Sequence, residues 1–354
     1  MLKIFRLNPI TRKRIRRFMR IRRGFYSFII LAGLTVISLF SNFIANNRAI
    51  LVKYEGKLYF PTFKFYSMET FGQEDEWGFT DAEANYRKLE DQYEGTDNWV
   101  LMPPVPFNPY ENDFEHYHNP PPNPPDNRHI LGTDSQGRDV FARLLYGFRV
   151  SIFFAISLVL ISQVIGAFVG SLQGYLAGRF DILSQRFIEI WGTLPFLYIV
   201  IIMATFFTPS FKLLLLIMSL FWWIKITYFM RTEMYREKTR QYCLAARSYG
   251  ASHLRVVFRH LLPNCLTPLV TFTPFAMVAA IGALTGLDYL GYGVPAPTPS
   301  WGELIDQALQ VQNRDKIWLT LAPFSAISIT LILVTLVGEG VREAFDPRQF
   351  ARYK

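Results

Sequence analysis

The side chains that do most enzyme chemistry form no catalytic pattern in this chain. No Gly-x4-Gly-Lys-Ser/Thr phosphate loop occurs in its 354 residues, so we do not assign ATP hydrolysis to it. No Ser-His-Asp arrangement and no metal-spaced cluster is present either, and the pair His116-x-His118 is too small a ligand set in an acidic loop. We therefore predict a protein that is not an enzyme and that holds no metal or cofactor.

Two charged residues in or beside apolar runs raise a different kind of chemistry. Glu189 would be a proton-relay candidate in a secondary transporter, although Arg186, three residues earlier, can pair with it at the interface. Lys225 lies six residues before Arg231, about 9 Å along a helix. Its side chain either snorkels to the interface or lines a cavity. These two residues make an autonomous proton-coupled carrier one candidate function of the chain. A membrane scaffold without a transport role is another candidate.

The elements that carry these residues are long uncharged segments. The chain is 51% hydrophobic and only 18% charged, which is typical of an integral membrane protein. Since a helix needs about 20 apolar residues to cross the hydrocarbon, we predict six transmembrane helices. The runs are Gly24–Asn47, Val150–Gly178, Ile190–Phe211, Leu213–Met230 (interrupted only by Lys225), Leu261–Leu287 and Ile317–Gly338.

The distribution of charge predicts the orientation. Residues 1–24 contain ten Lys/Arg and no acid, and residues 231–264 contain seven Lys/Arg. The positive-inside rule therefore places both termini and this loop in the cytoplasm. The net charge of +9 then reflects topology and lipid contact, and no nucleic-acid partner is predicted. Only two cysteines occur, Cys243 and Cys265, so neither a disulfide framework nor a metal cluster is supported.

The polar stretch Arg231–Asn264 between two spans is the strongest functional signal. We predict a helix over Gln241–Tyr249, a left-handed turn at Gly250, and a second helix from a cap at Ser252 to Leu262, ended by Pro263. The second helix has an apolar stripe opposite its cationic residues. The stripe consists of Leu254, Val257, Phe258 and Leu261. A membrane-surface helix held only by lipid charge is the simpler alternative.

This stretch resembles the cytoplasmic signature loop of ABC-importer permeases, in the oligopeptide and dipeptide branch whose loop ends His-x-Leu-Pro-Asn. The matching residues are Ala245, Ala246, Gly250, His260, Leu262, Pro263 and Asn264. Leu244 stands where the family pattern usually has glutamate. The resemblance implies a coupling helix that sits in a groove of a separate ATPase subunit.

Further segments resemble the same family. The segment before the second span matches it at Gly132, Thr133, Asp134, Gly137, Arg138 and Asp139. A helix cap at Asp134 or Ser135 with interfacial Arg138 and Asp139 is our preferred interpretation, and a direct substrate role is the alternative. The Gly/Pro-rich region after the fifth span is a candidate outer gate, at Gly291, Gly293, Pro299 and Trp301.

Together these motifs predict the all-α type I ABC-importer permease fold, most similar to the smaller permease subunit of microcin C and oligopeptide uptake transporters. The resemblance implies a bacterial inner-membrane protein that imports peptides with a second permease, a periplasmic peptide-binding protein and an ABC ATPase that binds Mg-ATP. The expected divisions are a basic cytoplasmic terminus (1–24), transmembrane helix 1 (25–45), an extracytoplasmic insert (46–130), a permease core (131–341) with the coupling loop (231–264), and a cytoplasmic tail (342–354).

The insert and the second span carry two more local predictions. Ile50–Tyr54 and Lys57–Phe60 predict a hairpin around Glu55-Gly56, and nine prolines make Pro103–Pro125 extended. Aromatic residues suggest that the insert packs on a surface as a lid or a binding-protein contact. They are Trp77, Trp99, Phe107, Tyr110, Phe114 and Tyr117. In the second span the glycines at 166, 170, 174 and 178 predict one close helix contact.

Overall fold

The structure is a computed structural model and describes residues 9–75, 78–114, 117 and 119–346. The chain divides into two compact units. The helical unit comprises Met1–Ala32, Ser151–Pro295 and Ser328–Lys354, and the insert unit comprises Gly33–Val150 and Ala296–Ile327. The helices α2, α4 and α13 run from one unit into the other.

The membrane-length helices agree with the predicted number of spans. Five helices within the described ranges are long and apolar enough by themselves, and a sixth span results if the bent pair α5 and α6 counts as one. The five are α2 (Arg22–Leu39), α4 (Val140–Leu176), α7 (Phe211–Glu237), α11 (Thr267–Tyr289) and α13 (Ile317–Phe345). The pair is α5 (Gly178–Gly192) and α6 (Phe196–Phe206).

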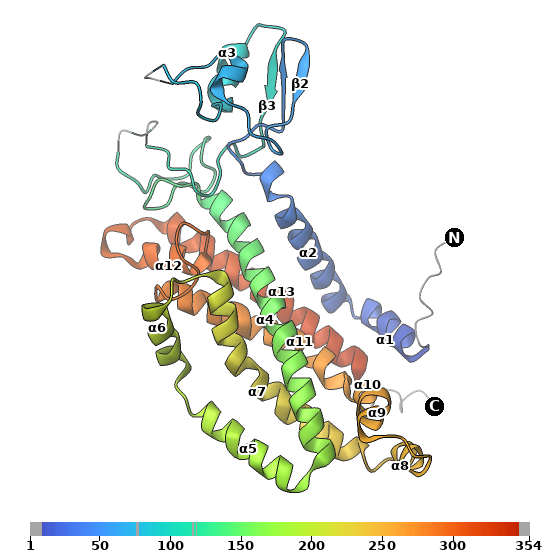
Figure 1. The fold of residues 1–354 in the computed structure, drawn as a ribbon. Coiled ribbons are helices and arrows are strands. Elements are labelled where there is room, and N and C mark those ends of the chain that lie inside the picture. The colour runs from blue at the N-terminus through green and yellow to red at the C-terminus, as the bar shows by residue number, and fades with distance from the viewer. Residues whose placement is uncertain (1–8, 76–77, 115–116, 118, 347–354) are drawn as a thin grey trace. The chain divides into compact units, whose positions relative to one another are not determined.

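The bend between α5 and α6 is 68° and is visible in Figure 1. Pro195 precedes α6 directly, and its missing N–H and fixed φ interrupt a continuous helix there. Residues Arg179–Asp181 are part of α5. The chain already reverses where α4 ends and α5 begins, because Ala177 and Gly178 have positive φ angles.

The predicted glycine contact is formed by α4 and α7. A Cβ added to Gly170 would lie 2.5 Å from the carbonyl oxygen of Thr227, and one added to Gly174 would lie 2.5 Å from that of Arg231. Gly166 approaches the carbonyl of Trp223 in the same way. Gly178 does not belong to this contact, because it begins α5 with a φ of 59° and has no atom near its added Cβ.

The N-terminal segment packs within the helical unit. After α1 (Pro9–Arg20) the chain continues as α2. Gly24 approaches Gly340 so closely that an added Cβ would lie 2.9 Å from its Cα. Arg23 pairs with two carboxylates of α13, at 3.5 Å from Glu339 and 3.5 Å from Glu343. Small residues and exposed ion pairs therefore hold the first span against the last one.

The insert unit contains a small antiparallel sheet in the order β2-β1-β3 (Figure 1). The predicted hairpin is β1 (Leu51–Tyr54) and β2 (Lys57–Tyr59). The third strand, β3 (Trp99–Leu101), pairs with β1 from more than 40 residues away and was not predicted. Residues Tyr86–Tyr93 form the helix α3. Buried Val52, Phe71, Tyr86 and Leu89 belong to one core, so the insert has a hydrophobic core of its own.

The proline-rich stretch has neither helix nor strand in its described residues, as expected. Of the aromatic residues predicted to pack, Phe107 is buried, whereas Trp99, Tyr110 and Phe114 are exposed. Trp77 lies outside the described residues, as do His116 and His118. The insert unit also contains α12 (Trp301–Leu309), which the Ser300 side chain caps. The helices of residues 231–264 are described below.

We expect Gly170→Ala to destabilise the protein by about 1–3 kcal/mol, because the new methyl group overpacks the α4–α7 contact. Gly282→Ala is the matched control, since an added Cβ at Gly282 meets no atom within 4 Å. Thermal unfolding of both variants in detergent measures the difference. Equal midpoints would show that the two helices separate without cost.

Candidate functional site

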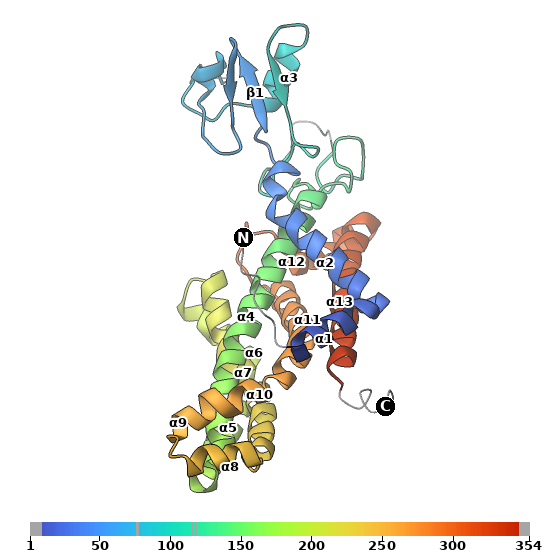
Figure 2. The ribbon, with the colours of Figure 1, turned by 90° about the vertical axis from the view of Figure 1, so that its right-hand side faces the viewer.

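The docking loop, residues 231–264, begins as the last turns of α7 and then folds into three short helices. These are α8 (Gln241–Ser248), α9 (His253–Arg255) and α10 (Leu262–Cys265). The chain reverses at Gly250, whose φ of 77° is left-handed as predicted. The N–H of Ala251 donates to the carbonyl of Ala246 at 3.1 Å, which closes the end of α8. Figure 2 shows α8 beside the continuous helical stretch that runs from α9 to α10.

Two details of the predicted second helix are wrong. Ser252 occupies the cap position, but its side chain makes no capping hydrogen bond. Pro263 does not end the helix, because it lies in the first turn of α10, where proline needs no N–H partner.

The predicted apolar stripe is also shifted. Val256–Leu261 forms a π-helical segment, in which hydrogen bonds connect residues five apart. Val256 and Leu261 are therefore both buried, together with Val257, whereas Leu254 and Phe258 are 64% and 42% exposed. The predicted stripe was derived from α-helical spacing. The π-helical turn is wider and brings a different set of side chains to the buried face.

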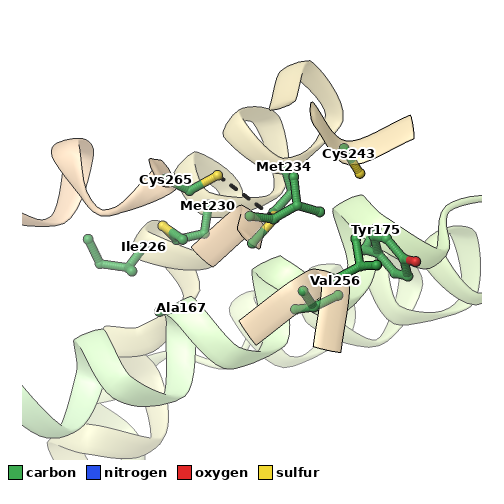
Figure 3. Packing of buried hydrophobic residues seen from close by; sticks show 10 residues of the cluster. Ala167, Tyr175, Ile226, Met230, Met234, Cys243, Val256 and Cys265 are labelled. Atoms are coloured by element: carbon green, nitrogen blue, oxygen red, sulfur yellow. Dashed lines mark hydrogen bonds between the residues drawn. The ribbon is translucent and has the colours of Figure 1, made fainter. Parts of the chain in front are cut away.

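The docking loop is fixed to α4 and α7 by one hydrophobic core (Figure 3). Met230 and Met234 of α7 are fully buried and face the loop residues Cys243, Val256 and Cys265. The Sγ atom of Cys265 lies 3.8 Å from the sulfur of Met234. Both cysteines are free, and burial raises the pKa of the Cys265 thiol to about 12. They serve as apolar packing groups.

An ion pair fixes the start of the loop. Arg231 donates to both carboxylate oxygens of Asp181, each at 2.6 Å, and the Tyr235 hydroxyl donates to the same carboxylate at 2.6 Å. The pair joins α5 to α7 beside the glycine contact. The docking loop is therefore connected through short contacts to α4, α5 and α7.

The residues of the family signature divide between the core and the surface. Ala246 and Leu262 are half-buried and pack against the core, whereas Leu244 and Ala245 are exposed. The Asn264 side chain donates to the carbonyl of His260 at 2.8 Å. Tyr249 was missed by sequence reasoning, although it adjoins the turn at Gly250, and it is 91% exposed.

The segment before α4 is a buried ion network of the insert unit. The helix cap is Asp139, whose side chain accepts from the N–H of Ala142 at 2.7 Å. The predicted caps were therefore wrong. Arg138 and Asp139 are 5% and 1% exposed, and their placement at the membrane interface stays a prediction. Asp134 instead closes a turn, accepting from the N–H of Arg138 at 2.9 Å.

Two arginines connect this turn to α12. Arg138 bonds the carboxylates of Asp134 and Glu303 at 2.7 and 2.9 Å, and Arg143 also pairs with Glu303. Burial alone would lower the pKa of Arg138, but the two carboxylates raise it. The remaining motif residues shape the backbone. Gly132 and Gly137 have φ of 72° and 77°, and the Thr133 hydroxyl accepts from the N–H of Asn123 at 2.8 Å.

A second buried cluster surrounds His129. Its Nδ1 lies 2.8 Å from Asp139 and its Nε2 lies 3.2 Å from Asp113. Because both ring nitrogens face carboxylates, the imidazolium form satisfies both contacts. Burial would lower the pKa of His129, but the hydrogen bonds and charges of these carboxylates raise it. Arg128 also contacts Asp113, at 2.8 Å.

The candidate outer-gate residues lie in different units. In the helical unit Gly291 has a φ of 78° after α11, and an added Cβ at Gly293 would collide with the Asp288 carboxylate. In the insert unit the indole of Trp301 is buried and donates to the carbonyl of Leu144 at 3.0 Å, while Pro299 precedes α12. Their role as a gate stays a prediction.

The residues considered for a proton-coupled carrier are both exposed. Glu189 pairs with Arg186 at 2.6 Å, as predicted. Lys225 borders a groove of about 640 Å³ whose other lining residues carry no charge. They come from α6, α7, α11 and the end of α5 with the turn that follows it. No group of three or more metal-ligating side chains occurs in the part of the chain that the structure describes.

These features define a polytopic helical membrane protein with a structured docking loop between two spans. Residues 142–351 match the family described as binding-protein-dependent transport system inner membrane component. The chain belongs to this family. It is therefore a type I ABC-importer permease of the inner membrane and not an enzyme, and membership implies a separate ATPase and a substrate-binding protein.

Relatives match nearly the whole chain. The inner membrane ABC transporter permease protein YejE of Escherichia coli is 39% identical, covering 97% of this chain and 99% of its own length. The peptidoglycan transport system permease protein YejE of Agrobacterium fabrum is 38% identical over 98% of this chain and 95% of its own length. The dipeptide permease DppC of Bacillus subtilis is 32% identical over 64% of this chain and 70% of its own length. A MetNI methionine ABC transporter structure, described as inward facing, aligns with a TM-score of 0.49 and 16% identity over 58% of this chain and 97% of its own.

The His129 cluster predicts a pH-dependent stability. A raised folded-state pKa stabilises the fold fully below the unfolded pKa, about 6.5, and this contribution is lost as pH rises through the folded value. We expect His129→Gln to cost about 3–5 kcal/mol near pH 6, because two buried carboxylates lose their cation, and to cost less at alkaline pH.

Thermal unfolding between pH 5.5 and 9 measures this effect. Asp113→Asn is the second variant, because it removes one of the two carboxylates that raise the pKa of His129 and should shift the stability loss to lower pH. A constant difference between wild type and His129→Gln across the range would contradict the imidazolium assignment.

Proposed function

We propose that this chain is the permease subunit of an ATP-driven importer of short peptides. Relatives that span its core are named as dipeptide and oligopeptide permeases, and the two relatives that match its full length include one named for peptidoglycan transport. Peptides, peptide antibiotics of the microcin C type and peptide-bearing wall fragments share a peptide backbone. That backbone is the cargo chemistry we assign.

The docking loop is the observation that supports energy coupling most directly. The aromatic side chain of Tyr249 is 91% exposed at the tip, and the neighbouring Leu244 and Leu254 are 51% and 64% exposed. Exposed aromatic and aliphatic side chains on a well-packed support are typical of a protein interface. We infer that the loop seats in the ATPase subunit at these residues and at the signature positions.

The hydrophobic core beneath the loop supports a mechanism. Nucleotide-driven closure of the ATPase pair would displace α8, and Met230 and Met234 would pass the displacement to α7 and, across the glycine contact, to α4. Tilting of these spans would change the path from outward-facing to inward-facing. The bound nucleotide and Mg²⁺ belong to the ATPase in this proposal.

The proposal includes the topology and the assembly. In this proposal both termini and the docking loop lie in the cytoplasm, where the positive-inside rule favours their Lys and Arg residues, and the insert lies outside. The second half of the path comes from a second permease subunit, and a periplasmic binding protein delivers the peptide. The chain divisions at residues 24, 45, 130 and 341 are kept as part of it.

We expect Tyr249→Ala to weaken ATPase binding by about 2 kcal/mol, roughly 30-fold, because the complex loses an aromatic side chain that the ATPase would bury. Tyr249→Phe keeps the ring and should bind within about threefold of wild type. Affinity of the purified ATPase for the permease complex in nanodiscs measures this. If Tyr249→Ala and Tyr249→Phe bind the ATPase equally well, the ATPase contact lies at other residues of the permease.

Ala246→Glu extends the same experiment to coupling. Its half-buried methyl group packs on the loop core, so a charged side chain should unseat α8 and abolish peptide-stimulated ATP hydrolysis while membrane insertion persists. Transport driven by a proton gradient, with the purified chain alone and without ATP, would instead favour the carrier alternative.

The insert offers a separate test. Ala45 and Val105 form a bridge, so residues 48–102 can be replaced by a short Gly-Ser linker without removing Asp113 or the proline-rich stretch. If the insert receives the binding protein or covers the path, peptide uptake by the assembled transporter should fall at least tenfold while basal ATP hydrolysis stays unchanged. Unchanged uptake would show that the insert is a spacer.

A further inference from the structure

A cavity of about 500 Å³ borders the docking loop beside α8, and its lining includes two cationic residues, Lys238 and Arg247, together with His253. Lys238 follows α7, Arg247 belongs to α8, and His253 begins α9. Tyr175 of α4 and Leu244 of α8 complete the part of the lining that matters here.

The cationic side chains are held in place by specific contacts. Lys238 donates to the carbonyl of Gly174 at 2.8 Å, and the guanidinium of Arg247 stacks 4.9 Å from the ring of Tyr175. The Tyr175 hydroxyl lies 2.8 Å from Nδ1 of His253. The three groups are thus positioned around one space by α4 and cannot simply turn away from one another.

No carboxylate borders this cavity within the described residues. Glu237, next in sequence to Lys238, accepts from the Tyr242 hydroxyl at 3.0 Å and lies near Arg236 and Arg240. Asp181 is held by Arg231 and Tyr235. Burial, and then the charge of Arg247, lower the pKa of Lys238, and Asp181 offsets this only in part. Lys238 and Arg247 therefore border the cavity without a carboxylate in its lining, and two such cations attract an anion.

We propose that this cavity receives an aspartate or glutamate side chain of the ATPase subunit when the docking loop is seated. The inference rests on the proposed function, because it needs an ATPase at the loop. The position of Leu244 supports the choice of partner: it borders the cavity and is 51% exposed on α8, the helix that leads to Tyr249. The cavity therefore opens on the face that the ATPase would cover.

Arg247→Glu provides the sharpest test, because it reverses the charge of one of the two cations that border the cavity. We expect it to weaken binding of the purified ATPase subunit to the permease complex at least tenfold, since the partner's carboxylate then meets a like charge. Arg247→Gln should weaken binding less, because it removes the attraction without adding a repulsion.

Arg179→Glu is the control for net charge, because Arg179 is exposed near the start of α5 and does not border the cavity. A carbodiimide, which joins an amine to a carboxylate in contact with it, should in addition link Lys238 to an acidic residue of the ATPase. Mass spectrometry of the linked peptides then identifies that residue.

The proposal is overturned if Arg247→Glu binds as well as wild type, or if it weakens binding no more than Arg179→Glu. It is also overturned if the losses appear only in nanodiscs of anionic lipid, because a lipid phosphate would then be the occupant. If Tyr249→Ala weakens binding while these variants do not, only the acidic contact fails. If Tyr249→Ala has no effect either, the proposed docking itself fails.

Discussion

The close approach of α4 and α7 is the contact on which the rest of the helical unit depends. Backbone carbonyls of α7 occupy the space that side chains at Gly166, Gly170 and Gly174 would need. At this distance Met230 and Met234 can reach both α4 and the docking loop. Without the glycines the two helices would separate by about the width of a methyl group, and the loop core would lose one wall.

Local signals in the sequence were sufficient for the turn of the docking loop but not for the helix after it. Gly250 predicts a left-handed residue because other side chains are strained there. Nothing comparable marks Val256–Leu261, since a π-helix results from how the segment packs and not from its residue types. The predicted buried face was therefore right at Val257 and Leu261 but wrong at Leu254 and Phe258, and it missed Val256.

The same distinction explains the insert unit. The hairpin of β1 and β2 has a two-residue turn and could be predicted, whereas β3 pairs with β1 through a contact that sequence spacing does not show. Asp134 was predicted as a helix cap, but it pairs with Arg138, and the same arginine also binds Glu303, which lies 169 positions after Asp134 in the sequence numbering. The bond to this distant carboxylate engages Arg138, and the cap is left to Asp139. Charged residues in the sequence thus indicate that an ion network exists, but they do not indicate which residues pair with one another.

The π-helical segment has a consequence for how related sequences are compared. A π turn holds one residue more than an α turn between the same two ends, so a relative that lacks a residue within 256–261 can adopt ordinary α geometry and still deliver its Leu-Pro-Asn at the same place. A one-residue gap at this position of an alignment therefore marks a change of winding, and the flanking segments remain equivalent.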